Sequence, residues 1–192
     1  MNSKRIIFLI HDLSPWGGQD KSVLEIIKGV RKNFPVDLYS FSLAGLSWTH
    51  GVFHRVWPHV RRPVLVKSMI FYIFTFLHIR WRRRGFFSPR AAAPELIHAT
   101  GACAWVSDVI QVQFIHAAWN EIQSAYFKTE TSSGGLFHQA YQKTMMAFDM
   151  WMEKRIYSRD KTYITLSRRC AQDLKKHFGV DQSVHIIPHG VD

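Results

Sequence analysis

The chain has 192 residues, the usual length of one domain, and 47% of them are hydrophobic, which is enough for a sizeable core. These values exclude a disordered, fibrous or repetitive protein. The net charge of +11 is uneven: residues 1–96 carry 15 Lys or Arg against 5 Asp or Glu, and residues 97–192 carry 10 against 9. The basic excess indicates either a surface that meets something anionic or a solvated basic face without a partner.

The first four segments predict the opening of a doubly wound α/β sheet. Residues 4–11 form an unbroken apolar run after a charged start, which is typical of a buried strand. A loop with two glycines follows at 12–18, and residues 19–33 have the spacing of a helix. Residues 36–43 predict the second strand. Strand, glycine loop, helix and strand in this order are typical of a parallel sheet with flanking helices.

Residues 44–57 predict an irregular stretch with a short strand near 52–57, and residues 63–84 predict an apolar helix. Its most apolar part, 69–79, is too short to span a bilayer, which takes about 20 residues. The end of this helix is basic and aromatic: Arg80, Trp81, Arg82, Arg83 and Arg84. Such an end is found on helices at a membrane surface, but also on the solvated end of a core helix. Both interpretations stay open, with these five residues as membrane-facing candidates.

The second half continues the alternation. We expect strands at 95–99, 108–115, 162–166 and 184–187, a loop-like polar stretch at 120–134, and helices at 136–157 and 168–178. The helix 136–157 has one apolar face, made of Phe137, Tyr141, Met145, Phe148, Met152 and Ile156. Alternating strands and helices predict a mainly parallel sheet and therefore a Rossmann-like, doubly wound α/β fold.

Three places carry candidate chemistry. Gly17 and Gly18 allow backbone amides to approach a phosphate at a helix N-terminus, although the pattern is not GxGxxG and such a turn can use glycine for geometry alone. His116 follows the strand 108–115 at the edge where open α/β sheets bind ligands, where it is either functional or structural. Ser167 is a good helix N-cap, which explains it without a function.

Other classes of site find no support in the sequence. Cys103 and Cys170 have neither metal-ligand spacing nor a disulfide framework, and the apolar run 6–10 is too short for a secretory signal. We therefore expect a reducing, cytoplasmic location and no metal. Nucleic-acid binding would rest on charge alone, because the basic residues lie beside an apolar helix rather than on a stacking platform.

In their order, these segments resemble the N-terminal domain of retaining, GT-B-fold glycosyltransferases of family 4. Gly17-Gly18 is similar to the family's glycine pair after the first strand. Residues 153–167 resemble its "E-x-x-x-Y … v-i-a-v-S" stretch, and residues 173–192 resemble "d-L … f-g-v … v-x-v-I-P-N-G-V-D", with His189 in place of the asparagine. The resemblance is loose between residues 44 and 95 and most specific over the last forty.

The resemblance implies a two-domain enzyme. Residues 1–187 would form its acceptor-side domain, and residues 188–192 would begin the linker to a C-terminal donor-binding domain that this chain lacks. The enzyme would move a sugar from a nucleotide-sugar, its co-substrate, to a glycan or lipid-linked glycan, as in lipopolysaccharide or polysaccharide biosynthesis. It would need no cofactor. Without the C-terminal domain, the chain would hold the nucleotide-sugar poorly and be inactive.

The resemblance also implies roles for single residues. His116 would be the catalytic residue beside the transferred sugar, and Gly17 and Gly18 would approach the donor diphosphate. Three further side chains would line the cleft: Trp16, Ser167 and Arg168. The basic half would fit a protein that rests on the inner face of the cytoplasmic membrane. The alternative is a non-catalytic module that binds a glycan, a lipid or a partner protein.

Overall fold

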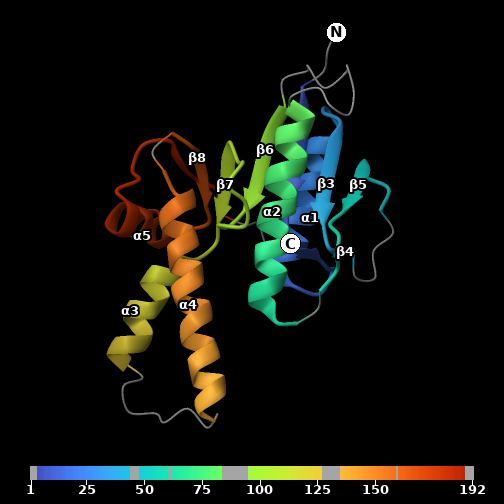
Figure 1. Ribbon diagram of the computed structural model, residues 1–192. Coiled ribbons are helices and arrows are strands. Elements are labelled where there is room, and N and C mark those ends of the chain that lie inside the picture. The colour runs from blue at the N-terminus through green and yellow to red at the C-terminus, as the bar shows by residue number, and fades with distance from the viewer. Residues whose placement is uncertain are drawn as a thin grey trace. The chain divides into compact units, whose positions relative to one another are not determined.

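The computed structural model describes residues 4–43, 48–60, 62–83, 95–126, 135–158 and 160–188. It divides into two compact units, Met1–Gln111 and Val112–Asp192. Each unit is built on parallel strands with helices beside them (Figure 1). The predicted Rossmann-like α/β class is therefore confirmed.

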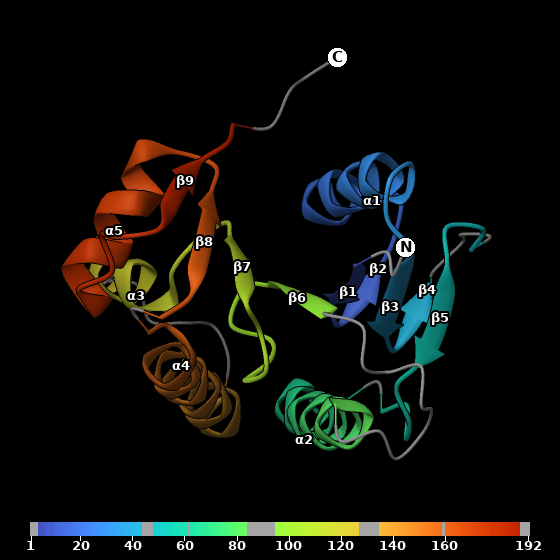
Figure 2. The same ribbon diagram turned by 90° about the horizontal axis from the view of Figure 1, so that it is seen from above.

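The sheet of the first unit has the strand order β5-β3-β1-β6-β7, with parallel pairing throughout. These strands are β1 (Arg5–Leu9), β3 (Val36–Ser40), β5 (Val52–Arg55), β6 (Glu95–Thr100) and β7 (Val109–Val112). Helix α1 (Gly18–Arg31) covers one face of the sheet and α2 (Val64–Arg83) covers the other (Figure 2). A two-residue ladder of β2 (Asp12–Leu13) and β4 (Ser42–Leu43) follows the ends of β1 and β3.

The core of this unit has two layers because successive strand residues point to opposite faces of the sheet. Ile7 and Leu9 pack toward α2, with Phe71 and Ile79 of that helix. The alternating positions of the same strand pack toward α1, whose contribution is Val23, Leu24 and Ile27. Since β1 is buried on both faces, its sequence is an apolar run and not an alternating pattern.

The second unit contains a parallel pair, β8 (Thr162–Thr165) and β9 (Val184–Ile186), with three helices. The helices are α3 (His116–Tyr126), α4 (Leu136–Ile156) and α5 (Arg168–Phe178). The C-terminus of α5 is capped by Gly179, whose φ of 66° is the left-handed conformation that glycine adopts without strain. The predicted linker begins at Pro188, and residues 189–192 lie outside the described part of the chain.

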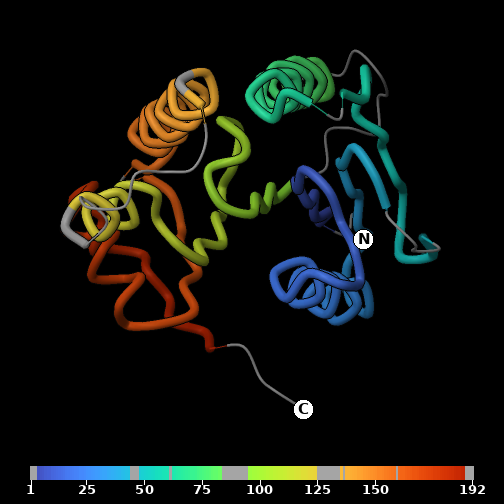
Figure 3. The backbone as a smooth tube through the Cα atoms, turned by 90° about the horizontal axis from the view of Figure 1, so that it is seen from below, coloured from blue at the N-terminus to red at the C-terminus, as the bar shows by residue number. Residues whose placement is uncertain are grey.

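Two sequence predictions for the second unit were wrong. The strand predicted over 108–115 ends at Val112, and the residues from His116 onward, expected to be loop-like after 120, form α3. The predicted apolar face of α4 is buried at its C-terminal end, at Met152 and Ile156, whereas Phe137 at the other end is 94% exposed. Helix α3 runs beside α4 (Figure 3) and shields other positions of it.

The burial of His98 predicts how the unfolding free energy of the first unit depends on pH. His98 lies in β6 with its ring against Phe8, and burial lowers its pKa to about 4 from 6.5. A histidine with a lowered pKa stabilises the fold fully above pH 6.5 and loses that contribution as the pH falls toward 4, because the unfolded chain binds the proton first. Replacing His98 by Leu should therefore reduce the pH dependence of the unfolding free energy in this window by about 1.4 kcal/mol per pH unit. Urea unfolding measured across the window checks this, and an unchanged slope contradicts it.

Candidate functional site

The glycine loop of the first unit lies between β1 and α1, as predicted. Gly17 is the N-cap of α1, and its carbonyl accepts the amide of Lys21. A Cβ atom added to Gly18 would meet open space, whereas one added to Gly17 would lie 3.2 Å from Oδ2 of Asp20. Gly18 is thus free of packing demands. Trp16, just before the pair, is 88% exposed and so stands in solvent within this structure.

An acidic side chain already occupies the N-terminus of α1. Oδ2 of Asp20 accepts hydrogen bonds from the backbone amide and the hydroxyl of Ser14, each at 3.1 Å. A carboxylate at this end is favoured by the helix dipole. A diphosphate bound there would meet this charge, so the proximity of Gly17 and Gly18 to the donor stays a prediction.

A polar cluster that the sequence did not predict lies beside the β2–β4 ladder. Asp12 forms an ion pair with Lys67 at the start of α2, and the Ser42 hydroxyl donates to Oδ1 of Asp12 at 2.6 Å. Burial would raise the pKa of Asp12, but the bonds from Lys67 and Ser42 outweigh it and lower the pKa. The available sequence signal was the position of Asp12 directly after the first apolar strand, where ligands of open α/β sheets gather.

In the second unit, His116 is the first residue of α3 and is held by two carboxylates. Its Nδ1 lies 2.9 Å from Oε1 of Glu153, which also accepts the His116 backbone amide at 2.7 Å. Oε2 of Glu153 accepts the amide of Ala117 at 3.2 Å. Nε2 of His116 faces Asp149 at 3.7 Å. A side chain from α4 therefore supplies the N-terminal cap of α3 and fixes the histidine at the same time.

The charge of His116 follows from these contacts. Burial lowers the pKa of His116, but the hydrogen bond and charge of Glu153 and the charge of Asp149 outweigh burial, so the pKa ends above its ordinary value. The two acids therefore favour the protonated ring more than water does, and they fix the orientation of both ring nitrogens. A ring held in this way can donate a hydrogen bond or take part in proton transfer.

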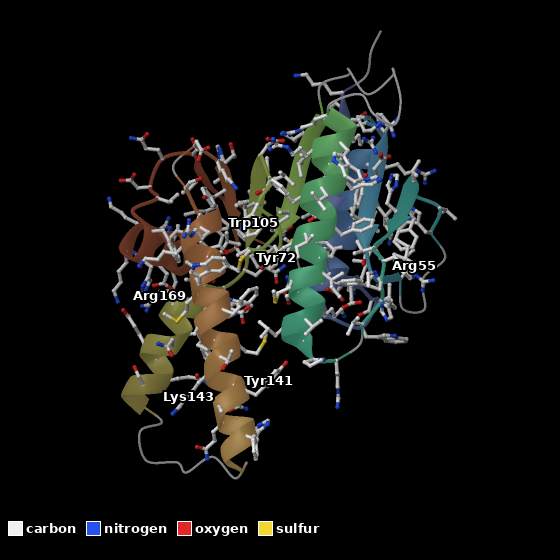
Figure 4. All side chains as sticks on the ribbon, in the orientation of Figure 1. Arg55, Tyr72, Trp105, Tyr141, Lys143 and Arg169 are labelled. Carbon is white, nitrogen blue, oxygen red and sulfur yellow. The ribbon has the colours of Figure 1, made fainter. Side chains whose placement is uncertain are left out.

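Ser167 and Arg168 open α5, and the structure separates their roles. The Ser167 hydroxyl accepts the backbone amide of Cys170 at 3.2 Å, so it is the N-cap of the helix. A hollow of about 540 Å³ between α3 and α5 is lined by Ser167 and Arg169, together with the exposed rings of Phe114 and Trp119. Figure 4 labels Arg169. Arg168 is exposed and is not part of this lining.

The basic end of α2 divides between two environments. Arg82 was a membrane-facing candidate, and this was wrong: its guanidinium lies 2.7 Å from Asp37 and 2.8 Å from Glu95, at the buried side of the helix. Arg80 and Trp81 are exposed, and Arg83 is exposed with an ion pair to Asp108 at 3.2 Å. Arg84 lies outside the described residues.

No group of three His, Cys, Asp or Glu side chains able to hold a metal ion occurs in the parts of the chain that the structure describes. The expectation of a metal-free, cofactor-free reaction stays a prediction. Both cysteines are buried as free thiols.

Comparison with known proteins places the chain in a family. The sequence model of glycosyltransferase family 4 matches residues 16–192. The chain belongs to this family. The family match covers the glycine loop, His116, Glu153 and the start of α5, which are the features described above. No curated protein matches the chain in sequence.

The solved structures add the fold. One similar structure is that of WaaG, a glycosyltransferase involved in lipopolysaccharide biosynthesis, with a TM-score of 0.70 and 14% identity. The match covers 97% of this chain and 45% of the WaaG chain, so the chain spans less than half of that protein. MurG of Acinetobacter baumannii matches with a TM-score of 0.30 and 11% identity, over 98% of this chain and 69% of that one. At these identities, the WaaG likeness establishes the Rossmann-like fold alone.

The capping role of Glu153 generates a prediction. Glu153→Gln keeps the shape of the side chain but removes the charge that raises the pKa of His116 and weakens the cap of α3. We expect a lower His116 pKa, read from its ring resonances in an NMR titration, and a loss of about 1–3 kcal/mol of stability. Glu121→Gln, which removes an exposed carboxylate of α3 that pairs with Lys176, is the charge-matched control. It should leave the His116 pKa unchanged and cost less than about 1 kcal/mol. A His116 pKa that stays the same in Glu153→Gln would refute the pairing.

Proposed function

We propose that this chain is the acceptor-side half of a glycosyltransferase that moves a sugar from a nucleotide-sugar to a glycan or lipid-linked glycan. The observation that carries the proposal is the His116 ring, fixed by Glu153 and Asp149 at the first turn of α3 in a chain of family 4, with its pKa raised by these two acids. Sugar transfer leaves a nucleoside diphosphate, whose negative charge grows as the bond to the sugar breaks. A preorganised cation at that point lowers the barrier because its orientation needs no adjustment.

In this proposal the chain's own residues bind and orient, and no cofactor takes part. Glu153 keeps the orientation of the His116 ring fixed. The proton on Nε2 of His116 can then be donated to the substrate in a hydrogen bond or transferred to Asp149. Trp16, Gly17, Gly18, Ser167 and Arg168 stay candidates for the lining of the substrate site. The nucleotide-sugar would bind productively only with a donor-binding domain, so the isolated chain should not catalyse transfer.

His116 gives the direct test. In the full-length protein, His116→Ala should abolish release of nucleoside diphosphate from a panel of nucleotide-sugars supplied with extracted lipid-linked glycans. The loss expected for one charged transition-state contact is about 100-fold or more. The fold should persist because the backbone amides of residues 116 and 117 still reach Glu153. Circular dichroism checks the fold, and His185→Ala, at an exposed histidine of β9, is the control. Normal turnover in His116→Ala would remove this residue from the mechanism and favour the non-catalytic binding module.

A second observation supports attachment to a membrane. By length and composition α2 could cross a bilayer, with a window of mean hydropathy 1.4, yet only 28% of that window is buried. Its outward face carries a ridge of apolar side chains that are each at least 40% exposed: Val66, Met69, Ile73, Leu77 and Trp81. The inward face is tied to the sheet through Arg82 and Lys67. A helix fixed flat on a sheet with an outward apolar ridge is suited to lie in a membrane interface.

The charge of the same unit favours an anionic bilayer as the partner. The exposed Arg80 stands at the end of the ridge, with its guanidinium over the Phe76 ring at 5.8 Å. The neighbouring Arg83 also lies at this end, where it pairs with Asp108 at 3.2 Å. We propose that the protein acts in the cytoplasm, on the inner face of the cytoplasmic membrane, where lipid-linked acceptors would be within reach.

Co-sedimentation with vesicles of phosphatidylcholine and phosphatidylglycerol in a 3:1 ratio tests this attachment. Binding at low salt should fall when salt screens the charges and also when Ile73 and Leu77 are both replaced by Ser. Full burial of one such side chain is worth about 1.5–3 kcal/mol, and Ile73 and Leu77 have about half of their surface left to bury. The double variant should therefore bind about 10- to 100-fold more weakly. Val52→Ser, at an exposed apolar residue of β5, is the control. Absence of binding at low salt, or equal binding by the double variant, contradicts the proposal.

A further inference from the structure

Helices α3 and α4 face each other with polar side chains along most of their length. On α3 the facing positions are His116, Asn120 and Gln123, which are spaced by four and three residues. On α4 they are Gln139, Gln142, Met146, Asp149 and Glu153, with the same spacing. Helices that pack on a neighbour normally do so with an apolar stripe. Here most of the positions along the seam toward α3 carry amides or acids, and Tyr141 and Met145 of the predicted apolar stripe lie at its side.

The two helices enclose a groove of about 450 Å³ along this seam. Four amide side chains line it: Asn120, Gln123, Gln139 and Gln142. Its inner end is Asp149, whose carboxylate lies 3.7 Å from Nε2 of His116. The groove therefore leads from the exposed ends of the two helices to the histidine at the start of α3.

The chemistry of the lining limits what can bind. An amide both donates and accepts hydrogen bonds, as each sugar hydroxyl does, so a row of amides is complementary to a row of hydroxyls. Met145 and Met146 add adaptable apolar surface, and Tyr141 adds a ring, against which the C–H face of a sugar can pack. Lys143 is the one cation of the lining and lies on the opposite side of α4 from Tyr141 (Figure 4). A phosphate or carboxylate site would need more cations or a bidentate arginine.

We propose that this groove holds an uncharged, hydroxyl-rich segment of the glycan acceptor and guides its end toward His116 and Asp149. The inference rests on the proposed glycosyltransferase function and adds the acceptor class: a neutral oligosaccharide chain, bound by α3 and α4 of the second unit. A ligand of this class would use the seam in addition to its internal contacts, one of which joins Gln142 Nε2 and His138 Nε2 at 2.8 Å.

The test uses the chain in solution with maltotriose, cellotriose and N,N′,N″-triacetylchitotriose as probes. In NMR spectra, at least one trisaccharide should shift the side-chain amide signals of Asn120, Gln123, Gln139 and Gln142. The amide of Gln172, on the exposed side of α5, should not move. Replacing Gln123 and Gln142 together by Leu should weaken that binding about tenfold, because two hydrogen-bonding groups are lost. Gln172→Leu is the matched control and should bind as the unchanged chain does.

Two results would overturn the groove proposal: no shift of the four amides with any trisaccharide at about 20 mM, or equal affinity in the Gln123→Leu/Gln142→Leu variant. Transfer by the full-length protein separates this inference from the function on which it rests. If that protein is active and the double variant transfers normally, the groove is wrong and the function stands. If it releases no nucleoside diphosphate while the amide signals still shift, the transferase function is wrong and the groove binds glycan without catalysis.

Discussion

A single buried carboxylate organises the second unit. Glu153 is 1% exposed, and its two oxygens accept from two backbone amides and one imidazole nitrogen at the start of α3. An unpaired charge in that position would be strongly destabilising, so the three donors have to be in place when the unit is folded. The start of α3, the rotamer of His116 and the charge of its ring all follow from this one side chain. Glu153 therefore serves both the fold of the second unit and the proposed role of His116, and its replacement should affect both.

The first unit also contains a buried carboxylate with several partners, near the N-terminal end of β3. Asp37, 1% exposed, binds Arg5 at 2.6 Å and Arg82 at 2.7 Å. Burial would raise the pKa of Asp37, but the His54 ring and the two arginines bring it to about 2. This network turns Arg82 toward the sheet and fixes the C-terminal end of α2. The rotation that buries Arg82 is the one that leaves Ile73, Leu77 and Trp81 outside, so an ion pair determines which side of α2 is available to a membrane.

The sequence predicted those parts of the molecule whose cause is local. Apolar runs gave the strands at 4–11 and 95–99, and Ser167 and Gly179 marked the ends of α5. Helix α3 was missed because its cap comes from Glu153, 37 residues away, which no local pattern can reveal. His116 follows β7 in the chain, but it lies in α3 and not directly after a strand over 108–115, and its pKa depends on two acids from another helix. Arg82 was misassigned because a row of arginines looks uniform in sequence, whereas a helix turns each one toward a different environment.

The contrast between the two ends of the α3–α4 pair shows how an anchor and an open site can coexist. Near Glu153 the helices are joined by charge-assisted hydrogen bonds, and Met152 and Ile156 lie buried behind them. Away from that end the two helices enclose the groove, whose lining combines four amides with Tyr141, Met145 and Met146. Pairing of amide side chains with one another contributes little net stability, because each exchanges one hydrogen bond for another. The anchor therefore holds the helices at one end while the other end stays accessible, which is the geometry that a ligand approaching His116 along α3 requires.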